Sequence, residues 1–188
     1  MQVINWEIFL QNGLPLNGKQ SSMTVGIFDG VHLGHQSLLK CVVSHNAEFV
    51  PVVITFRDNH KTAGRDIQSF EERLNAFKSM GIQIAIVVDF TDEFKHMPGI
   101  EFLNLLIKHS SVGFFAVGSE FRCGYKLDTD AETIKNFFTS RGIPAEIVPQ
   151  VMEDFAPISS SRIRKAIAAG DLPLAEKMLG AKPDFNYH

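Results

Sequence analysis

Residues 26–35 read Gly26-Ile27-Phe28-Asp29-Gly30-Val31-His32-Leu33-Gly34-His35. They follow an apolar run, 23–28, and lead into an amphipathic stretch, 36–44, so they join a predicted strand to a predicted helix. Backbone amides and the helix dipole make such a helix start a binding place for anions, and phosphate is the natural guest. Gly30 and Gly34 allow the backbone to approach a ligand closely.

Two histidines in this segment, His32 and His35, bracket a glycine, so both imidazoles can turn toward one face at the helix start. There they can hydrogen-bond phosphate oxygens and stabilise the charge that builds up on a leaving pyrophosphate. If H-x-G-H stood alone, a structural histidine pair or a fragment of a metal site would explain it about equally well.

Five short apolar runs rich in Val, Ile and Phe recur along the chain and are typical of strands buried on both faces. They lie at 23–28, 49–56, 82–88, 113–118 and 145–148. Amphipathic stretches separate them, at about 36–44, 71–80, 100–109 and 131–139. This alternation predicts an α/β fold with a doubly wound, parallel, five-stranded sheet, in which ligands bind beyond the carboxyl ends of the strands.

Helix boundaries have local signals. Residues 69–72 and 129–132 both match S/T-x-x-E, in which a hydroxyl and a carboxylate cap the first-turn amides. Gly81 and Gly142 follow as helix stops. After Pro149 the pattern predicts two short helices, near 160–169 and 172–179, and no further strand.

Composition excludes several classes of protein. The chain has 188 residues, with 18 Lys+Arg against 21 Asp+Glu, 45% hydrophobic and 21% charged residues. This balance argues against a disordered chain and against a polybasic nucleic-acid binder. Apolar runs fall far short of the roughly 20 residues needed to span a bilayer, so we expect no membrane segment. The length suits one domain over residues 1–188.

Cysteine usage indicates a reduced compartment. Cys41 and Cys123 form no C-x-x-C pair and no Cys/His cluster, so neither a zinc site nor a disulfide scaffold is indicated. The N-terminus lacks a basic region followed by an apolar stretch, so we see no secretory signal. We expect a cytoplasmic protein.

A second anion site is predicted near residues 158–164. Ser159, Ser160 and Ser161 offer capping hydroxyls ahead of a helix, and Arg162 and Arg164 are fixed cations close to its start. Two arginines two positions apart on a helix do not share a face, so we expect one of them, Arg164, to reach the phosphates. A capped surface helix with ordinary basic residues is the alternative.

Taken together, these motifs resemble those of a known family. Residues 26–35 resemble the G-x-F-D-G-x-H-x-G-H signature of the bacterial FAD synthetase family, in its N-terminal FMN adenylyltransferase domain, and H-x-G-H marks the wider nucleotidyltransferase superfamily. Residues 158–164 are similar to the family's I-S-S-T-x-I-R, with Ser161 in place of Thr. The resemblance covers about residues 3–183. It implies a Rossmann-like nucleotidyltransferase fold and transfer of AMP from ATP to FMN, giving FAD and pyrophosphate.

The resemblance also implies site residues. His32 and His35 would stabilise the transition state, while Ser160 and Arg164 would hold the ATP phosphates. The other implied nucleotide-binding residues are Gly26, Ile27, Phe28, Asp29, Gly30, Gly34, Gly118, Ser159, Ser161 and Arg162. The implied flavin-binding residues are Phe56, His60, Glu120, Phe121 and Arg122. Mg²⁺ would accompany the triphosphate, but the sequence does not select its ligands.

Two loops depart from the family's pattern. In 117–124, which is similar to V-G-x-(D/N)-F-x-F-G, Glu120 stands where Asp or Asn is usual and Cys123 stands where Phe is common. Residues 57–60 replace the family's usual Pro-His-Pro. These departures bear on the details of substrate binding more than on the class of reaction.

Alternative functions remain open at this point. Another acceptor, such as phosphopantetheine, nicotinamide mononucleotide or a cytidylyl substrate, would suit the shared superfamily motifs. A non-catalytic carrier of nucleotide or flavin is a second alternative. Bifunctional relatives carry a riboflavin kinase barrel after this domain, whereas this sequence ends at His188, so we expect either a naturally monofunctional protein or a shortened one. We expect small-molecule partners and take a monomer as the working assumption.

Overall fold

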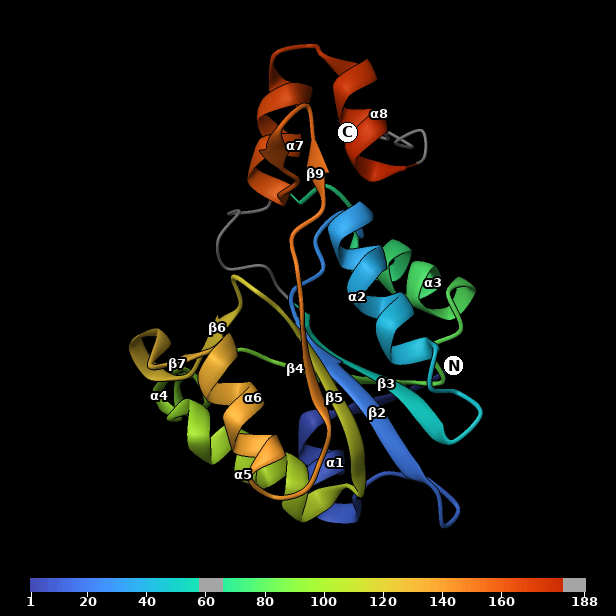
Figure 1. Cartoon of the computed structure of the whole chain (residues 1–188), viewed down its shortest axis with the longest axis vertical. Helices are drawn as coiled ribbons and strands as arrows, with labels where there is room; N and C mark the ends of the chain where they lie inside the picture. The colour runs from blue at the N-terminus through green and yellow to red at the C-terminus, as the bar shows by residue number, and fades with distance from the viewer. Residues whose placement is uncertain (58–65, 181–188) are drawn as a thin grey trace.

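The computed structural model describes residues 1–57 and 66–180. Within this part, six parallel strands form one sheet in the order β1-β4-β3-β2-β5-β8 (Figure 1). They are β1 (Gln2–Asn5), β2 (Gln20–Val25), β3 (Phe49–Phe56), β4 (Ile84–Val88), β5 (Val112–Gly118) and β8 (Ala145–Val148). After the central strand β2, the chain adds β3 and then β4 on one side of β2. It then crosses over and adds β5 and β8 on the other side of β2. The crossing places a topological switch point between β2 and β5, where α/β folds bind ligands.

Helices cover both faces of the sheet (Figure 1). On one face pack α2 (Leu33–Val43) and α3 (Phe70–Ser79), and on the other α1 (Trp6–Asn12), α5 (Gly99–His109) and α6 (Ala131–Thr139). Alternate side chains of a strand enter different cores: Val52 and Ile54 pack with α5 and α6, while Val53 packs with α2. Burial on both faces explains why the strands appear in the sequence as unbroken apolar runs.

Short elements surround the carboxyl ends of the strands. They are α4 (Asp92–His96), the hairpin of β6 (Arg122–Cys123) and β7 (Thr129–Asp130), and a 3₁₀ turn, η1 (Tyr125–Leu127). Asp128 fastens this hairpin to the start of α5, because its Oδ1 accepts hydrogen bonds from the amide of Gly99 (3.0 Å) and the hydroxyl of Thr129 (2.9 Å).

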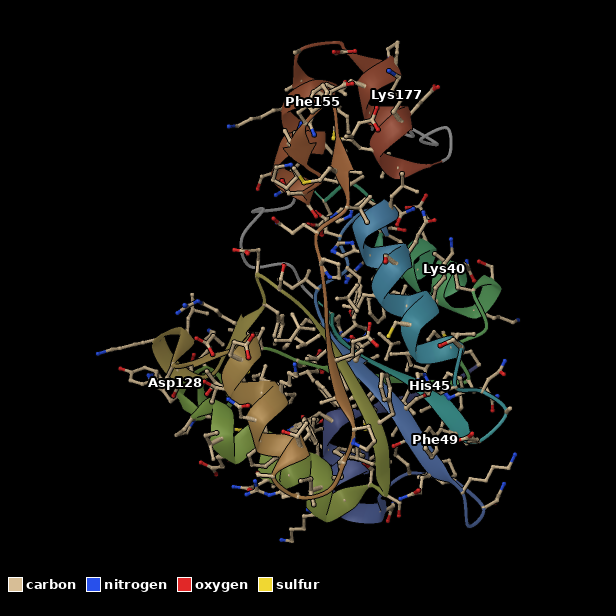
Figure 2. The ribbon with its side chains drawn as sticks, in the orientation of Figure 1. Lys40, His45, Phe49, Asp128, Phe155 and Lys177 are labelled. Carbon is tan, nitrogen blue, oxygen red and sulfur yellow. The ribbon has the colours of Figure 1, made fainter. Side chains whose placement is uncertain are left out.

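The C-terminal helices form a separate small unit. α7 (Ser160–Ala168) and α8 (Leu172–Leu179) pack beside a hairpin of β9 (Met152–Glu153) and β10 (Ala156–Pro157). Figure 2 shows Phe155 and Lys177 at this end, far from Phe49 at the other. The unit has an apolar cluster of its own, made of Ile158, Ile163, Ala166, Ala175, Met178 and Leu179. Gln36 on α2 ties the unit to the sheet domain, because its side-chain amide donates to the carbonyls of Val31 (3.0 Å) and Leu179 (2.9 Å).

The parallel α/β fold predicted from the sequence is confirmed, but several details are wrong, among them the start of the strand predicted at 82–88, which begins at Ile84. The sheet has six strands rather than five, because β1 has one buried residue, Ile4, and no apolar run marks it. The first predicted strand ends at Val25 rather than Phe28, whose φ of 58° breaks the extended backbone. The β9–β10 hairpin contradicts the expectation that no strand follows Pro149.

Of the two predicted capping boxes, one forms. Ser69 accepts from the amide of Glu72 (3.2 Å), and the Glu72 carboxylate accepts from the amide of Ser69 (2.7 Å). At α6 the N-cap is Asp130, which accepts from the amide of Thr133 (2.9 Å), so the predicted cap at residue 129 is wrong by one position. Across residues 1–57 and 66–180, no helix is long and apolar enough to cross a membrane.

Candidate active site

A cavity of about 600 Å³ opens beyond the carboxyl ends of the strands, which is an ordinary size for a small-molecule site. One wall is the β2–α2 loop with the start of α7, and the opposite wall is aromatic. Between them lie the β5–β6 loop at Gly118 and the segment that follows β8 at Val148. The cavity thus occupies the switch point between β2 and β5.

The two histidines meet at the start of α2. Nδ1 of His32 accepts a hydrogen bond from the backbone amide of His35 (3.3 Å), so His32 is the N-cap of the helix. Because Nδ1 accepts, the proton of the neutral ring lies on Nε2. The two imidazoles stack with their centroids 3.6 Å apart and their planes 16° apart, and both line the cavity.

Burial keeps both rings neutral. Removal from water lowers the pKa of His32 to about 4. The pKa of His35 lies well below its usual value, first because of burial and then because a charge on its ring would be repelled by a protonated His32 and by Arg73. At pH 7 the Nε2–H of His32 is therefore a neutral donor. Within the described residues, Nδ1 of His35 meets no hydrogen-bond partner.

Phe28 supports the histidine pair from within the protein. Its ring lies 5.2 Å from that of His35 and 5.4 Å from that of Phe77, both in edge-on geometry, and it is 1% exposed. A φ of 58° is uncommon for a bulky residue and stores strain, which proteins retain mainly at functional sites. Although Phe28 borders the cavity, its ring packs chiefly against protein.

The motif glycines make room for side chains. A Cβ at Gly34 would lie 3.2 Å from the ring of His32, so glycine is needed for the capping contact. Gly30 has a φ of 84°, and a Cβ there would lie 3.0 Å from Ile67. Gly30 lies outside the cavity lining. The sequence predicts that both glycines admit a ligand, whereas in this structure they admit His32 and Ile67.

Asp29 joins the β2–α2 loop to two other segments. Its Oδ1 accepts from the amide of Ile67 (2.8 Å), and its Oδ2 accepts from Nη1 of Arg164 (2.5 Å). Its backbone carbonyl accepts from the hydroxyl of Ser160 (2.8 Å). Burial raises the pKa of this carboxyl, while the Ile67 amide and the Arg164 guanidinium act in the opposite direction. Asp29 therefore holds α7 against the loop that carries the histidines.

The start of α7 separates its two arginines. Ser159 caps the helix by accepting from the amide of Arg162 (3.2 Å). The Arg162 guanidinium turns away and donates to the carbonyls of Glu153 (2.8 Å) and Ala156 (3.0 Å), which fixes the β9–β10 hairpin. Arg164 lines the cavity and Arg162 does not. The structure thus does not place Arg162 with the other predicted nucleotide-binding residues.

The aromatic wall contains residues that the sequence analysis found and others that it missed. Of the predicted flavin-binding residues, the cavity is lined by Phe56, Glu120, Phe121 and Arg122. His60 lies outside the described residues. The cavity is also lined by Phe90, Phe94, Met97, Phe102 and Cys123, which were not predicted as site residues. The rings of Phe90 and Phe94 lie 5.5 and 5.8 Å from that of Phe56, so three rings meet there.

One signal could have revealed this wall. Phe90 follows β4 almost directly, and the carboxyl end of every strand in such a sheet is a candidate ligand position. Phe94 and Phe102 lie on α4 and α5, and their side chains also pack on the sheet core, so a core role accounts for them in the sequence.

Metal ligands are not gathered in this site. Among the described residues, no group of three His, Cys, Asp or Glu side chains could hold a metal ion. The cavity lining does include two separate carboxylates, those of Asp29 in the β2–α2 loop and Glu120 in the β5–β6 loop.

An anion-binding helix start at the switch point of a parallel α/β sheet, with a second helix start beside it on the same wall of one cavity, is consistent with a Rossmann-like nucleotidyltransferase fold. The family model for FAD synthetase matches residues 15–162, which is well over half of the chain. The chain belongs to the FAD synthetase family.

Curated relatives agree with this assignment. The chain is 28% identical over 170 residues to a bifunctional riboflavin kinase/FMN adenylyltransferase of Buchnera aphidicola subsp. Schizaphis graminum, covering 85% of this chain and 54% of that protein. It is 27% identical over 172 residues to an FAD synthetase of Listeria monocytogenes, covering 87% of this chain and 70% of that one. The chain thus spans about half the length of the bifunctional relative.

A solved structure has the same fold. The crystal structure of a protein described as a macrolide-efflux protein from Streptococcus pneumoniae is similar with a TM-score of 0.84 and 29% sequence identity. The match covers 97% of this chain and 72% of that one. Nearly all of this chain therefore lies within a fold that has been observed by experiment.

Proposed function

We propose that this protein is an FMN adenylyltransferase, which transfers AMP from ATP to FMN and releases pyrophosphate. The observation that carries the proposal is the pairing, in one cavity, of a phosphate-binding wall with an aromatic wall. Membership of the FAD synthetase family supports it. An enzyme that joins a nucleotide to a flavin needs both kinds of surface side by side.

The phosphate-binding wall suits adenylyl transfer. An oxygen of the FMN phosphate attacks the α-phosphorus of ATP in line, and the bond from that phosphorus to the β-phosphate oxygen breaks. The attacking phosphate is already anionic at pH 7, so no base is needed. Catalysis then consists of positioning and of stabilising the charge on the departing pyrophosphate.

The histidines supply neutral donors for that charge. The Nε2–H of His32 is available because Nδ1 is engaged with the helix, and stacking keeps His35 beside it. Donors already in place where charge develops are worth about 3 kcal/mol each in transition-state stabilisation. Arg164 would give a fixed positive charge to the β- and γ-phosphates, with Ser160 beside it at the helix start.

The aromatic wall suits the flavin. The isoalloxazine ring is large, planar and mostly apolar, and rings such as those of Phe56, Phe90 and Phe121 offer faces and edges to such a group. Cys123 lies on the same wall, where its buried thiol has a pKa raised to about 12 and stays protonated. An uncharged thiol is compatible with an apolar flavin pocket.

Mg²⁺ would enter with ATP as part of the substrate. It demands octahedral oxygen coordination and usually keeps several waters, so phosphates and one or two carboxylates are enough to hold it. Of the two acidic residues that line the cavity, Glu120 is exposed and would suit this requirement, whereas both carboxylate oxygens of Asp29 are already engaged by Ile67 and Arg164. When bound, the ion would neutralise triphosphate charge. The family's reaction and the free thiols Cys41 and Cys123 favour a cytoplasmic location.

The test is direct. Purified protein is incubated with ATP and Mg²⁺ and either FMN or riboflavin, and FAD and pyrophosphate are followed by chromatography. We expect FAD from FMN and none from riboflavin. FMN binding without FAD formation would favour a flavin carrier, and the absence of FMN binding would favour another acceptor. Omission of Mg²⁺ should abolish FAD formation.

A further inference from the structure

A buried arginine lies beneath the candidate active site without reaching into it. Arg73 on α3 is 2% exposed, and its guanidinium donates to backbone carbonyls at the carboxyl ends of two neighbouring strands. Nη1 donates to the carbonyls of Ile27 (2.6 Å) and Phe56 (3.1 Å), and Nη2 donates to the carbonyl of Arg57 (2.9 Å). Arg73 lies outside the cavity lining.

These carbonyls lie where the sheet's own hydrogen bonding ends. The register of β2 and β3 runs to the pair Val25 and Ile54, and a last bond joins the Gly26 amide to the Ile54 carbonyl (3.0 Å). Beyond that point the backbones that follow β2 and β3 separate, and Ile27 lies in the loop that leads to the histidines. Arg73 spans the gap between the separated backbones. The hydroxyl of Thr55 also donates to the Ile27 carbonyl (3.2 Å) and so reinforces the link.

A buried guanidinium is costly unless hydrogen bonds satisfy its donors, as the three backbone carbonyls do here. Its planar, forked array of donors can address several carbonyls at fixed angles, which a single ammonium group does not do. Two of the carbonyls belong to Ile27 and Phe56, which line the cavity on its two different walls. The position of each wall thus depends on the same side chain.

We propose that Arg73 is a positioning residue of the active site: by clamping the carbonyls of Ile27 and Phe56 it fixes the distance between the phosphate-binding loop and the aromatic wall. It acts through these backbone groups and does not touch either substrate. The proposal rests on the proposed function, because the two walls would hold ATP and FMN in line for reaction.

Two substitutions of Arg73 distinguish the effect of its positive charge from the effect of its forked array of hydrogen-bond donors. Arg73→Lys keeps a cation but loses the fork, and Arg73→Met keeps length but loses both. The control is Ser22→Ala, which removes a buried hydrogen bond from Ser22, in the first half of β2, to the carbonyl of Val42 on α2 (2.9 Å). All are assayed as the full chain, at a temperature where circular dichroism shows them folded.

We expect kcat for FAD formation to fall about 30-fold in both Arg73 variants, since small displacements of reacting groups have effects of this size. KM for ATP should change less than about threefold, because Arg73 does not contact nucleotide, and Ser22→Ala should keep its kcat. A kcat within threefold of wild type in folded Arg73→Met would overturn the proposal. Full activity in Arg73→Lys would also overturn it, since charge alone would then suffice.

A second measurement does not depend on activity. In amide NMR spectra without ligand, both Arg73 variants should shift the signals of residues 26–35, while signals of α6 and β8 stay in place. Unchanged loop signals would contradict the clamp. If wild-type protein makes no FAD, the proposed function fails, and these spectra still decide whether Arg73 positions the loop.

Discussion

At the scale of single residues, His32 performs two tasks with its two ring nitrogens. Nδ1 accepts the His35 amide and so begins α2, which leaves Nε2–H for the ligand. If the proposed function holds, the cap of the helix and the catalytic donor are one side chain. Any substitution at this position changes folding and chemistry together unless the replacement keeps the capping bond.

This coupling predicts different outcomes for two variants of His32. His32→Ala should destabilise the protein by about 1 kcal/mol through loss of the cap and should lower kcat by about 10² to 10³. His32→Asn should restore the cap, since Asn is a preferred N-cap residue, but should leave the shorter side chain away from the phosphates. Urea unfolding and FAD formation are measured for both.

The matched control is His96→Ala, because His96 lies on α4 with an exposed side chain and does not line the cavity. It should keep the wild-type kcat. A fully active, capped His32→Asn variant would show that the ring's Nε2 takes no part in the reaction.

At the scale of elements, the start of α6 provides a sharp test of local structure. Asp130 accepts both the amide and the hydroxyl of Thr133, at 2.9 and 2.8 Å, whereas the sequence pattern would assign the capping carboxylate to Glu132. Asp130→Ala should therefore lower the free energy of unfolding by about 1 kcal/mol, and Glu132→Ala should change it by less than about 0.5 kcal/mol. Equal effects in urea unfolding would argue against Asp130 as the cap.

Elements with strong signals were predictable from sequence, and weak ones were not. The apolar run of β3 has the predicted bounds, because seven of its eight residues are buried. The run of β8 also has the predicted bounds, although Val148 is its one buried residue. β1 pairs with one neighbour at the edge of the sheet and buries one residue, so its pattern resembles that of a loop. The hairpin β9–β10 has two-residue strands and depends on Arg162, a tertiary contact that no local pattern contains.

The two walls of the candidate site also differ in how well the sequence predicts them. Its phosphate-binding wall is continuous in sequence at residues 26–35 and 158–164, so motifs reveal it. Its aromatic wall is assembled from Phe56, Phe90, Phe94 and Phe121 on separate segments, and a phenylalanine that faces a ligand looks in sequence like one in the core. No sequence motif marks Arg73, because the hydrogen bonds that define its position go to backbone carbonyls, which any residue provides.

At the scale of the whole molecule, the buried histidines make stability depend on pH. An unfolded histidine takes up a proton near pH 6.5, whereas folded His32 does so at about 4. Between these values the unfolded chain binds more protons, so stability is fully present above pH 6.5 and is lost as the pH falls toward 4. His35 acts with the same sign, and the raised pKa of Asp29 offsets part of the loss at the acid end.

We therefore expect the free energy of unfolding to fall by at least about 2 kcal/mol between pH 7 and pH 5. Urea unfolding at the two pH values measures this difference. In His32→Asn the same difference should be smaller by about 2 kcal/mol. An unchanged pH dependence in that variant would show that His32 is not desolvated in the folded state.

The small apolar cluster around α7 and α8 affects how readily this end of the protein opens. Among the described residues this cluster has six buried side chains, against 23 and 12 in the two clusters of the sheet domain, so the unit can open while the sheet stays folded, and its amide hydrogens should exchange with solvent before those of β2 and β5. Each opening would carry Arg164 away from the loop that holds the histidines. A bound triphosphate would oppose that motion, so slower exchange in α7 would report occupancy of the site even under conditions in which no product forms.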